Sequence, residues 1–503
     1  MNKAGTVYLV GAGPGDAGLL TLRGAELLRR ADVVIYDRLV NPELLHLAPP
    51  AAELISRGKR QDVSQEKLNE LMIAKAREGK CVVRLKGGDP YIFGRGGEEA
   101  EALAVAKIPF EVVPGVSSIA AVPNYAGIPL THRDHTSNFT VFTGHEGEGK
   151  STSSLDFDQI ARISGTKVIL MGVTHLHELT QALLARGMSG DTPVAIIERG
   201  TMGDQKSVTG TLATIEPLAA KANIKPPAIT VIGEVVKLRD KLNWFERRPL
   251  FGQRVVVTRA RAQARELSDR LTAHGAEVLE IPCIKTVQPS RLQDVADALL
   301  ELNSYDWLVF TSPNGVTSFF DFFFKAFHDT RDLGGPRIAA VGPGTAAKLQ
   351  EMHLQVDLMP DEPMATKVAA AFKKFETIEN LKICLLRAEV ANPELPQALE
   401  ALGAIVDDIA VYKTVAETED NGAGAKLLEA GADWITFTSG STVEHFHARF
   451  DLPALLKKFP HAKLASIGPE TSKPINALGL KPSVEARDHS VEGLVAALLK
   501  AQR

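Results

Sequence analysis

Residues 7–16 have the sequence VYLVGAGPGD, in which the apolar run Val7–Val10 leads into a glycine-rich turn. A dinucleotide-binding turn follows the pattern Gly-x-Gly-x-x-Gly, whose backbone N–H groups and helix start bind a pyrophosphate. Here Asp16 stands at the position of the third glycine, and Pro14 lacks an N–H, so the turn disfavours phosphate. Two interpretations stay open: a turn that a ligand without phosphates approaches closely, or a tight turn without a ligand.

Short runs rich in Val and Ile alternate with amphipathic stretches through the first half of the chain. This alternation is typical of α/β folds, in which strands and helices follow one another. The sequence therefore predicts an α/β fold. The predicted strands are Val7–Val10, Val33–Tyr36, Val82–Leu85, Val168–Met171, Val194–Ile197 and Ile229–Ile232.

Two further glycine-rich loops follow predicted strands. Residues 86–99 have the sequence KGGDPYIFGRGGEE, and residues 114–118 have the sequence PGVSS. Ligands bind beyond the carboxyl ends of strands in open α/β sheets, so we expect these loops to converge on one ligand. Paired glycines admit a flat molecule against the backbone, and Asp89 can accept hydrogens from hydroxyl or ammonium groups. Neither loop contains the Gly-Lys-Ser/Thr of a P-loop.

The second half of the chain contains an internal duplication. Asp306–Ser312 (DWLVFTS) recurs as Asp433–Ser439 (DWITFTS), an offset of 127 residues. Ile338–Thr345 recurs as Leu464–Thr471 at an offset of 126, and residues 254–287 resemble residues 382–415 at an offset of 128. An offset this long indicates two copies of a whole α/β lobe, because solenoid repeats have periods of roughly 20 to 50 residues. A cleft between two such lobes is a preferred place for a small-molecule site.

Composition sets limits on function. The chain has 503 residues, 45% of them hydrophobic, and a net charge of -4, so overall charge gives no case for nucleic acid as a partner. Three widely spaced cysteines favour buried free thiols in a reducing compartment. We find no basic-plus-apolar leader at the amino terminus and no run of eighteen apolar residues, and we expect a cytoplasmic protein without membrane association. The spacing of the histidines matches no strong ligand pattern, so we expect no metal.

Six motifs in order resemble the uroporphyrinogen III C-methyltransferases of the tetrapyrrole methylase family, over about residues 5–240. They are VGAGPGD at 10–16, YDRLV at 36–40, RLKGGDP at 84–90, VPGVSS at 113–118, AGIPLTHR at 126–133 and TGH at 143–145. The resemblance implies a two-lobed fold that binds S-adenosyl-L-methionine between its lobes, and a homodimer formed through this half. The implied cofactor-binding residues are Pro14, Gly87, Gly88, Asp89, Ile92, Ser117, Ser118, Met171, Gly200 and Ala228.

The same resemblance implies catalytic roles for two residues. Asp37 takes the position of the proton acceptor, and Lys59 that of the proton donor. An electron-rich pyrrole carbon takes the methyl group, and a carboxylate can stabilise the resulting charge or remove a proton. The alternatives are a turn or cap role for Asp37 and a solvated charge cluster around Lys59. Basic residues would meet the carboxylates of the macrocycle, and the candidates are Arg38, Arg57, Lys59, Arg60 and Arg133.

The second half resembles the uroporphyrinogen III synthases, over about residues 252–503. The motifs are FTSPNGV at 310–316, VGPGT at 341–345, VYKT at 411–414, TSGS at 438–441 and IGPET at 467–471. The resemblance implies closure of hydroxymethylbilane to uroporphyrinogen III with inversion of the last ring. Tyr412 takes the family's tyrosine position and could protonate the departing hydroxyl. Side chains that either hold substrate carboxylates or only cap helices are Ser312, Thr345, Ser439, Ser441 and Thr471.

We therefore predict an α/β protein in which a two-lobed tetrapyrrole methylase fold is followed by a duplicated two-lobed synthase fold. The predicted domains are residues 1–245 and 254–503, joined by a linker at 246–253. One synthase lobe combines about 254–286 with 415–503, and the other spans about 288–412. The partners would be small tetrapyrroles, and the product would serve either sirohaem or cobalamin synthesis. The alternative function is a nicotinamide-dependent oxidoreductase fused to a two-lobed binding module for small ligands.

Overall fold

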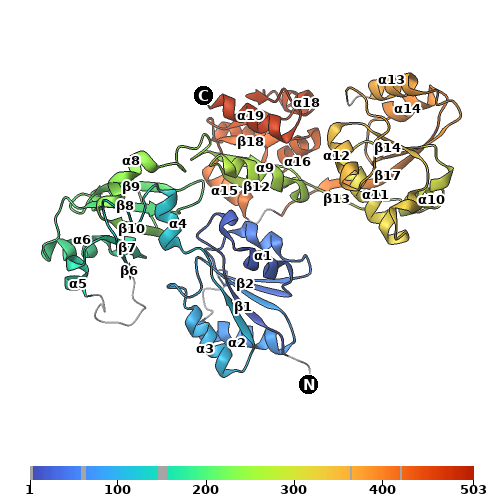
Figure 1. The fold of residues 1–503 in the computed structure, drawn as a ribbon. Coiled ribbons are helices and arrows are strands. Elements are labelled where there is room, and N and C mark those ends of the chain that lie inside the picture. Colours follow the sequence, from blue (N-terminus) through green and yellow to red (C-terminus); the bar gives the residue numbers. More distant parts are fainter. Residues whose placement is uncertain (1–3, 58–63, 145–155, 363–364, 420–421, 503) are drawn as a thin grey trace.

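The computed structural model describes residues 4–57, 64–144, 156–362, 365–419 and 422–502. Within these ranges the strands form four five-stranded sheets with helices packed on their faces (Figure 1). Each sheet has a cluster of buried apolar side chains on either face, because successive strand residues point to opposite sides. The predicted α/β class is confirmed.

The first sheet has the order β3-β2-β4-β1-β5, and its strands are parallel. Its strands are β1 Val7–Gly11, β2 Val33–Tyr36, β3 Glu53–Ser56, β4 Val82–Lys86 and β5 Phe110–Val113. Its helices are α1 Leu22–Arg29, α2 Gln65–Arg77 and α3 Gly96–Val105, with 3-10 turns at Ala17–Leu19 and Pro42–Leu47. Parallel strands place their carboxyl ends at one edge, where the glycine-rich loops begin.

The second sheet has the order β6-β7-β10-β8-β9, in which only β6 and β7 are parallel neighbours. Its strands are β6 Phe139–Thr143, β7 Thr166–Leu170, β8 Pro193–Glu198, β9 Lys206–Thr211 and β10 Ala228–Ile232. The helices are α4 Ser118–Tyr125, α5 Phe157–Arg162, α6 Leu176–Ala185, α7 Ile215–Lys221 and α8 Arg239–Leu242, with 3-10 turns at Val173–His175 and Glu234–Leu238. Helix α4 packs on this sheet and also follows a glycine-rich loop of the first, so it connects the two sheets.

The third sheet is parallel and combines two distant parts of the chain, in the order β12-β11-β18-β19-β20. Its strands are β11 Arg254–Val257, β12 Glu277–Glu280, β18 Trp434–Phe437, β19 Lys463–Ser466 and β20 Val484–Glu485. The helices are α9 Arg261–Ala273, α15 Ala423–Ala430, α16 Gly440–Phe450, α17 Leu452–Lys458, α18 Pro469–Ala477 and α19 Val491–Ala501. Buried residues of α9 and of α16 belong to different apolar clusters, so these helices cover opposite faces.

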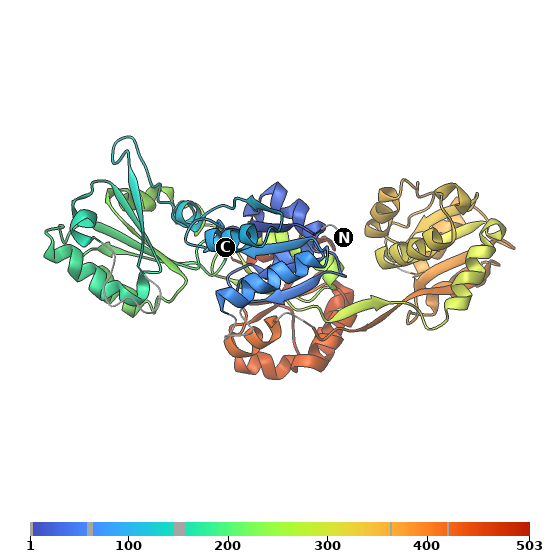
Figure 2. The same cartoon turned by 90° about the horizontal axis from the view of Figure 1, so that it is seen from below.

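The fourth sheet has the order β13-β17-β16-β14-β15, in which β13 is antiparallel and the others are parallel. Its strands are β13 Ile284–Val287, β14 Trp307–Phe310, β15 Arg337–Ala340, β16 Lys382–Ala388 and β17 Ile405–Ala416. The helices are α10 Leu292–Leu300, α11 Pro313–Ala326, α12 Pro343–Glu351, α13 Ala365–Phe375 and α14 Glu394–Glu400, with 3-10 turns at Leu302–Ser304 and Thr330–Leu333. Strands β13 and β17 form a ribbon that leads from this sheet toward the third (Figure 2).

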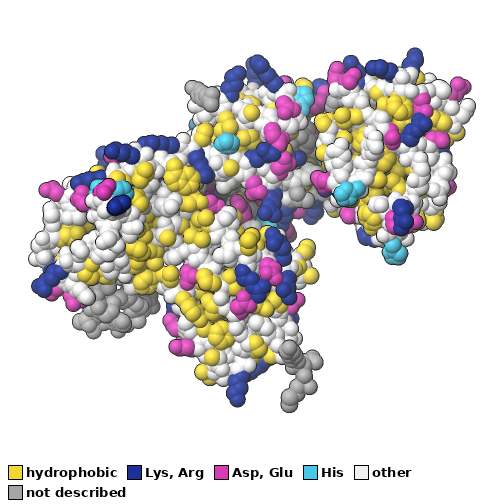
Figure 3. All heavy atoms as spheres, viewed as in Figure 1, with side chains coloured by type: hydrophobic (Ala, Val, Ile, Leu, Met, Phe, Trp, Pro, Cys, Tyr) yellow, Lys and Arg dark blue, Asp and Glu magenta, His cyan; other side chains and the backbone are white. Residues whose placement is uncertain are grey.

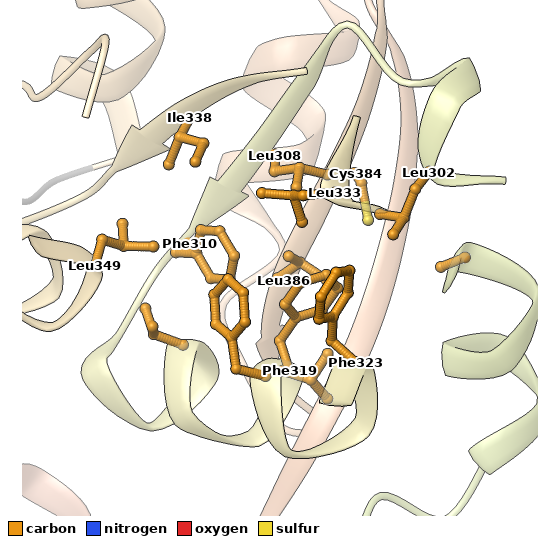
Figure 4. Close-up of a cluster of buried hydrophobic side chains, with 14 of the residues drawn as sticks. Leu302, Leu308, Phe310, Phe319, Phe323, Leu333, Ile338, Leu349, Cys384 and Leu386 are labelled. Carbon is orange, nitrogen blue, oxygen red and sulfur yellow. The ribbon is translucent and has the colours of Figure 1, made fainter. Parts of the chain in front are cut away.

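An aromatic core holds α11 on the fourth sheet. Phe319 and Phe323 of α11 pack beside Phe310 of β14, and all three are at most 1% exposed (Figure 4). Their spacing of four residues along α11 places both on one face of the helix. This packing fixes the start of α11 at the end of β14, next to Tyr412 of β17.

Residues 243–252 join the two halves through specific contacts. The ring of Tyr125 lies 5.0 Å from that of Trp244 and 4.8 Å from that of Phe245, which in turn lies 5.5 Å from Phe251. The N–H of Gly252 donates to the carbonyl of Gly203 at 3.2 Å. The predicted linker, residues 246–253, thus contacts the first half through Phe251 and Gly252 and the core of the third sheet through Leu250. On the visible face, basic and acidic side chains are interspersed (Figure 3).

Candidate active sites

The three glycine-rich loops of the first sheet meet backbone to backbone. Gly13 and Gly88 exchange hydrogen bonds, with N···O distances of 3.2 and 2.7 Å. A Cβ added to Gly115 would lie 2.2 Å from the Gly88 carbonyl oxygen and 2.7 Å from the Gly11 Cα. No side chain fits at Gly115 unless the backbone moves. The loops after β1, β4 and β5 thus form one continuous backbone surface.

Asp89 fastens two of these loops together. Its Oδ1 accepts the N–H of Tyr91 at 2.9 Å, and its Oδ2 accepts the N–H of Gly115 at 3.0 Å. Next to it, a Cβ on Gly87 would meet only the Cβ of Leu39, at 3.6 Å. The backbone at 87–88 is therefore open to a ligand, while Asp89 sets the shape of the surface.

The turn that opens the chain is fixed by its acidic residue. Asp16 Oδ1 accepts the N–H of Gly18 at 2.8 Å, and Oδ2 accepts the hydroxyl of Tyr125 at 2.8 Å. The N–H of Asp16 donates to Thr201 Oγ1 of the second sheet at 3.0 Å. A fixed carboxylate at this position repels a pyrophosphate, which agrees with the disfavoured phosphate site expected from the sequence.

The start of α4 and loops of the second sheet contribute other predicted cofactor residues. Ser117 caps α4 by accepting the N–H of Ile119 at 3.3 Å, and Ser118 begins that helix. A Cβ on Gly200 would lie 2.4 Å from Val122 of α4, so the loop after β8 approaches α4 closely. Met171 follows β7 and Ala228 begins the antiparallel β10, so both lie at the same edge. The loop after β8 also contacts the turn after β1, because Thr201 Oγ1 accepts the N–H of Asp16.

Two predicted residues are more exposed. Ile92 is 41% exposed in the loop after Asp89, and Met171 is 46% exposed with a φ of 55°. A half-exposed apolar side chain at a loop tip is available to contact a bound molecule.

A buried charge network lies behind Asp37. Arg84 of β4 donates from Nη2 to Asp37 Oδ1 at 2.5 Å and from Nε to Glu99 Oε1 at 3.2 Å. Glu99 Oε1 also accepts Lys86 Nζ at 2.9 Å and Gln65 Nε2 at 3.1 Å. Arg84 and Glu99 are 0% exposed and Lys86 is 1% exposed. Burial, and secondly the charge of Arg84, lowers the pKa of Lys86.

The predicted basic residues have different positions. Arg57 Nη1 lies 3.6 Å from Asp37 Oδ1, so it flanks the same carboxylate as Arg84. Arg38 follows Asp37 directly and is exposed, and Arg133 is exposed in the turn after α4. Lys59 and Arg60 lie outside the described residues.

In the second half, Tyr412 and Ser312 come together at the end of β14. The Tyr412 hydroxyl lies 3.0 Å from Ser312 Oγ, which also accepts the N–H of Gly315 and so caps α11. Tyr412 is 7% exposed, and this burial raises the pKa of its phenol, while its hydrogen bond with Ser312 opposes the shift. The phenol stays protonated at neutral pH and can therefore donate.

The other predicted hydroxyls cap or begin helices. Ser439 Oγ accepts the N–H of Thr442 at 3.3 Å, and Thr442 Oγ1 accepts the N–H of Ser439 at 3.4 Å, which gives α16 a capping box; Ser441 Oγ lies 3.0 Å from Ser439 Oγ. Thr345 and Thr471 lie in the first turns of α12 and α18, and each is 3% exposed. Ser439 thus has a structural role at its strand end, and the two threonines offer little surface to a ligand.

The third and fourth sheets face one another at helix starts. Gln263 Nε2 of α9 donates to Asn314 Oδ1 of α11 at 2.6 Å. Both residues lie in the first turn of a helix that follows a strand. The carboxyl edges of β11 and β14 therefore turn toward a common space.

Within the described residues, no cluster of three or more His, Cys, Asp or Glu is placed to hold a metal, and no helix is long and apolar enough to cross a membrane.

Each half of the chain matches a known protein family. The family model for tetrapyrrole (corrin/porphyrin) methylases matches residues 6–216, and the model for uroporphyrinogen-III synthase HemD matches residues 265–496. The porphyrin biosynthesis protein HemD of Ruminiclostridium josui is 39% identical over 502 residues, which cover 99% of this chain and 98% of that protein.

Other relatives match the first half alone. The S-adenosyl-L-methionine-dependent uroporphyrinogen III methyltransferase of Methanosarcina barkeri is 53% identical, over 47% of this chain and 94% of its own. The uroporphyrin-III C-methyl transferase of Thermus thermophilus, solved with S-adenyl homocysteine, is 40% identical with a TM-score of 0.41, over 46% of this chain and all of that one. Because the Ruminiclostridium relative matches end to end, the chain belongs to the family of porphyrin biosynthesis proteins that fuse a tetrapyrrole methylase to a uroporphyrinogen-III synthase.

Proposed function

We propose that the second half closes hydroxymethylbilane to uroporphyrinogen III with inversion of the last ring, and that the first half methylates this product twice to precorrin-2. The main support for methylation by the first half is the backbone surface formed by Gly11, Gly88 and Gly115 beside Asp37. The proposed methyl donor is S-adenosyl-L-methionine, as in the name of the Methanosarcina relative.

The residues at the surface fit this donor. Its sulfonium supplies an electrophilic methyl group, and it has no phosphate, so the fixed carboxylate of Asp16 does not oppose it. The open backbone at Gly87 and Gly88 can receive an adenosine or an amino-acid moiety at close range. A nicotinamide dinucleotide would bring its pyrophosphate to Asp16, and this repulsion argues against the oxidoreductase alternative.

Asp37 is the proposed proton acceptor. When a pyrrole carbon takes the methyl group, the macrocycle becomes cationic until a proton leaves. Arg84 holds Asp37 at the carboxyl edge of β2 and keeps Oδ1 in one place, so Oδ2 can turn toward the macrocycle. Arg38, Arg57 and Arg133 are proposed to pair with substrate carboxylates, and Lys59 is proposed as the proton donor.

In the second half, Tyr412 is the proposed general acid. The phenol would transfer its proton to the departing hydroxyl of hydroxymethylbilane, so that water leaves and an electrophilic pyrrole methylene remains. Ring closure with inversion then depends mainly on how the chain is folded within the cleft. Ser312 and Ser439 lie at the two facing strand ends, where helix starts favour the acetate and propionate groups.

Two activity assays test the two proposed reactions. Purified protein given uroporphyrinogen III and S-adenosylmethionine should form precorrin-2. Given hydroxymethylbilane alone, it should form the type III isomer instead of the symmetric type I isomer. Thermal stabilisation by S-adenosylhomocysteine but not by NAD would support the donor site, and the reverse would restore the oxidoreductase alternative.

We also propose a homodimer through the first half, and a monomer by sedimentation equilibrium would contradict this part.

A further inference from the structure

Arg259 carries a guanidinium with no assigned role. It lies between the end of β11 and the start of α9, at the carboxyl edge of the third sheet. Its Nε and Nη1 atoms are buried and have no hydrogen-bond partner among the described residues. Burial lowers the pKa of Arg259, and only Glu266 opposes the shift. Burying two nitrogens of an arginine without hydrogen-bond partners destabilises the folded state. We therefore expect that an anionic ligand pairs with this side chain.

The corresponding arginine of the fourth sheet is fully paired. At an offset of 128 residues, Arg259 corresponds to Arg387. Arg387 donates from Nε and Nη2 to the two carboxylate oxygens of Asp408, at 2.6 and 2.5 Å, and from Nη1 to the carbonyl of Asn392 at 2.6 Å. Asp408 thus neutralises the charge of Arg387, and the Asn392 carbonyl accepts an N–H of its third nitrogen.

The acid that could pair with Arg259 is engaged elsewhere. In the fourth sheet Asp408 stands opposite Leu385, and in the third sheet Glu280 stands opposite Val257. Glu280 therefore takes the register position of Asp408. Instead of an arginine, its Oε1 accepts the hydroxyl of Ser268 at 2.5 Å. The third sheet therefore lacks the ion pair that Arg387 makes with Asp408, and Nε and Nη1 of Arg259 have no hydrogen-bond partner among the described residues.

Arg259 stands where a ligand is expected. From β11 the chain proceeds to β12 on one side of the sheet, and from β18 it proceeds to β19 on the other. The intervening helices α9 and α16 cover opposite faces, so the ends of β11 and β18 form the switch point at which open α/β sheets have their ligand crevice. Ser439 caps α16 on one side of this switch point, whereas Ala260 at the start of α9 supplies no side-chain cap. Arg259 therefore directly precedes a helix start whose N–H groups have no side-chain cap.

We propose that Arg259, together with the start of α9, binds one carboxylate of the linear tetrapyrrole substrate of the second half. The contact between Gln263 and Asn314 brings this crevice to the space shared with the fourth sheet. A planar guanidinium suits a carboxylate because it can donate two parallel hydrogen bonds. The proposal rests on the synthase function proposed above.

Kinetics of Arg259 variants in the full chain test the proposal. With hydroxymethylbilane as substrate, Arg259→Gln should raise KM at least tenfold and change kcat less than threefold. Arg259→Lys should give an intermediate KM, because it keeps the charge but loses the bidentate geometry. The KM of the parent protein should rise with salt more steeply than that of Arg259→Gln, because the lost contact is ionic. The control is Arg270→Gln in the following helix α9, where the arginine is ion-paired with Glu492 and Glu266, and its KM should stay within twofold.

The outcomes separate the inference from the function it rests on. A KM within twofold of the parent value in Arg259→Gln, or a fall in kcat alone, overturns the proposed contact. If Arg259→Gln fails to fold, an unchanged KM and salt dependence in Arg259→Lys overturns it equally. A parent protein that forms only the type I isomer refutes the synthase function itself. We expect melting temperatures of both variants at or above that of the parent, because a desolvated cation without a partner is removed or shortened.

Discussion

Arg84 Nη2 lies 2.5 Å from Asp37 Oδ1, while Nε of the same guanidinium lies 3.2 Å from Glu99 Oε1. One fully buried side chain thus joins the proposed proton acceptor to an internal carboxylate on α3. The ion pair between Arg84 and Asp37 joins β4 to the end of β2, where the substrate is proposed to lie. Such an arrangement holds a carboxylate in a fixed position while leaving its second oxygen available.

Arg84→Lys tests this relationship. A single ammonium cannot donate to Asp37 and Glu99 at once in the same geometry, so Asp37 loses its orientation. We expect kcat for methyl transfer to uroporphyrinogen III to fall about 10- to 100-fold, with ring closure unchanged. The control is Arg23→Lys, whose arginine pairs with Glu26 and Glu111 at the surface. Methyl transfer at the parent rate in Arg84→Lys would show that the ion pair is only structural.

Gly115→Ala should distort the proposed donor site. The added Cβ would meet the Gly88 carbonyl at 2.2 Å, so the loops must separate, at a cost of about 1–3 kcal/mol. We expect S-adenosylhomocysteine binding, measured by calorimetry, to weaken at least tenfold. Gly97→Ala is the matched control, because a Cβ there meets nothing within 4 Å. Equal affinities of the two variants would place the donor elsewhere.

Tyr412→Phe removes the proposed general acid and keeps the ring. We expect ring closure to slow about 100-fold or more, the usual range for a lost general acid, while methylation of supplied uroporphyrinogen III stays unchanged. Tyr305→Phe is the control, since Tyr305 is also buried and donates its hydroxyl to Asp407 in the same sheet. A Tyr412→Phe variant that closes the ring at the parent rate would assign this tyrosine to packing.

Glu43 links stability to pH at the contact between the halves. Burial, together with the charges of Glu280 and Asp269 in the second half, raises the pKa of Glu43 from 4.5 to about 7. The folded state therefore binds more protons between these values, and stability falls as pH rises from about 4.5 to 7. At pH 8, Glu43→Gln should increase the free energy of unfolding by about 1–3 kcal/mol and so raise the melting temperature. At pH 4.5 it should have little effect.

The control for this prediction is Glu178→Gln, whose carboxylate is 75% exposed and contacts His175 of the first half. It should show the same melting temperature as the parent at both pH values. A Glu43→Gln variant that is no more stable than the parent at pH 8 would mean that the two halves do not bury Glu43 in solution.

Much of the architecture follows from periodicity in the sequence. The runs at Val7, Val33 and Val82 predict β1, β2 and β4 to within a residue, because buried parallel strands are continuously apolar. The glycine loops could also be predicted to converge, since parallel strands end at one edge. The same rule could not give the close contact of Gly115 with Gly88, which depends on the separation of two strands.

The charge network shows what a linear pattern misses. Arg84 and Lys86 alternate within an apolar strand, and this is a signal that buried partners are needed. The identity of the partners depends on how α3 packs, and Glu98 and Glu99 cannot be distinguished by sequence alone. In the structure Glu98 pairs with Arg95 at the surface, whereas Glu99 is buried against Arg84. Similarly, sequence equates Arg259 with Arg387, and only the structure shows that one is paired and the other is free.

The most direct test of the account gives the purified chain hydroxymethylbilane together with S-adenosylmethionine labelled with ¹³C in its methyl group. NMR of the product should show two labelled methyl groups on a type III macrocycle, which is precorrin-2. Labelled product from added uroporphyrinogen III but only unlabelled type I macrocycle from hydroxymethylbilane would contradict the claim that one chain performs both reactions.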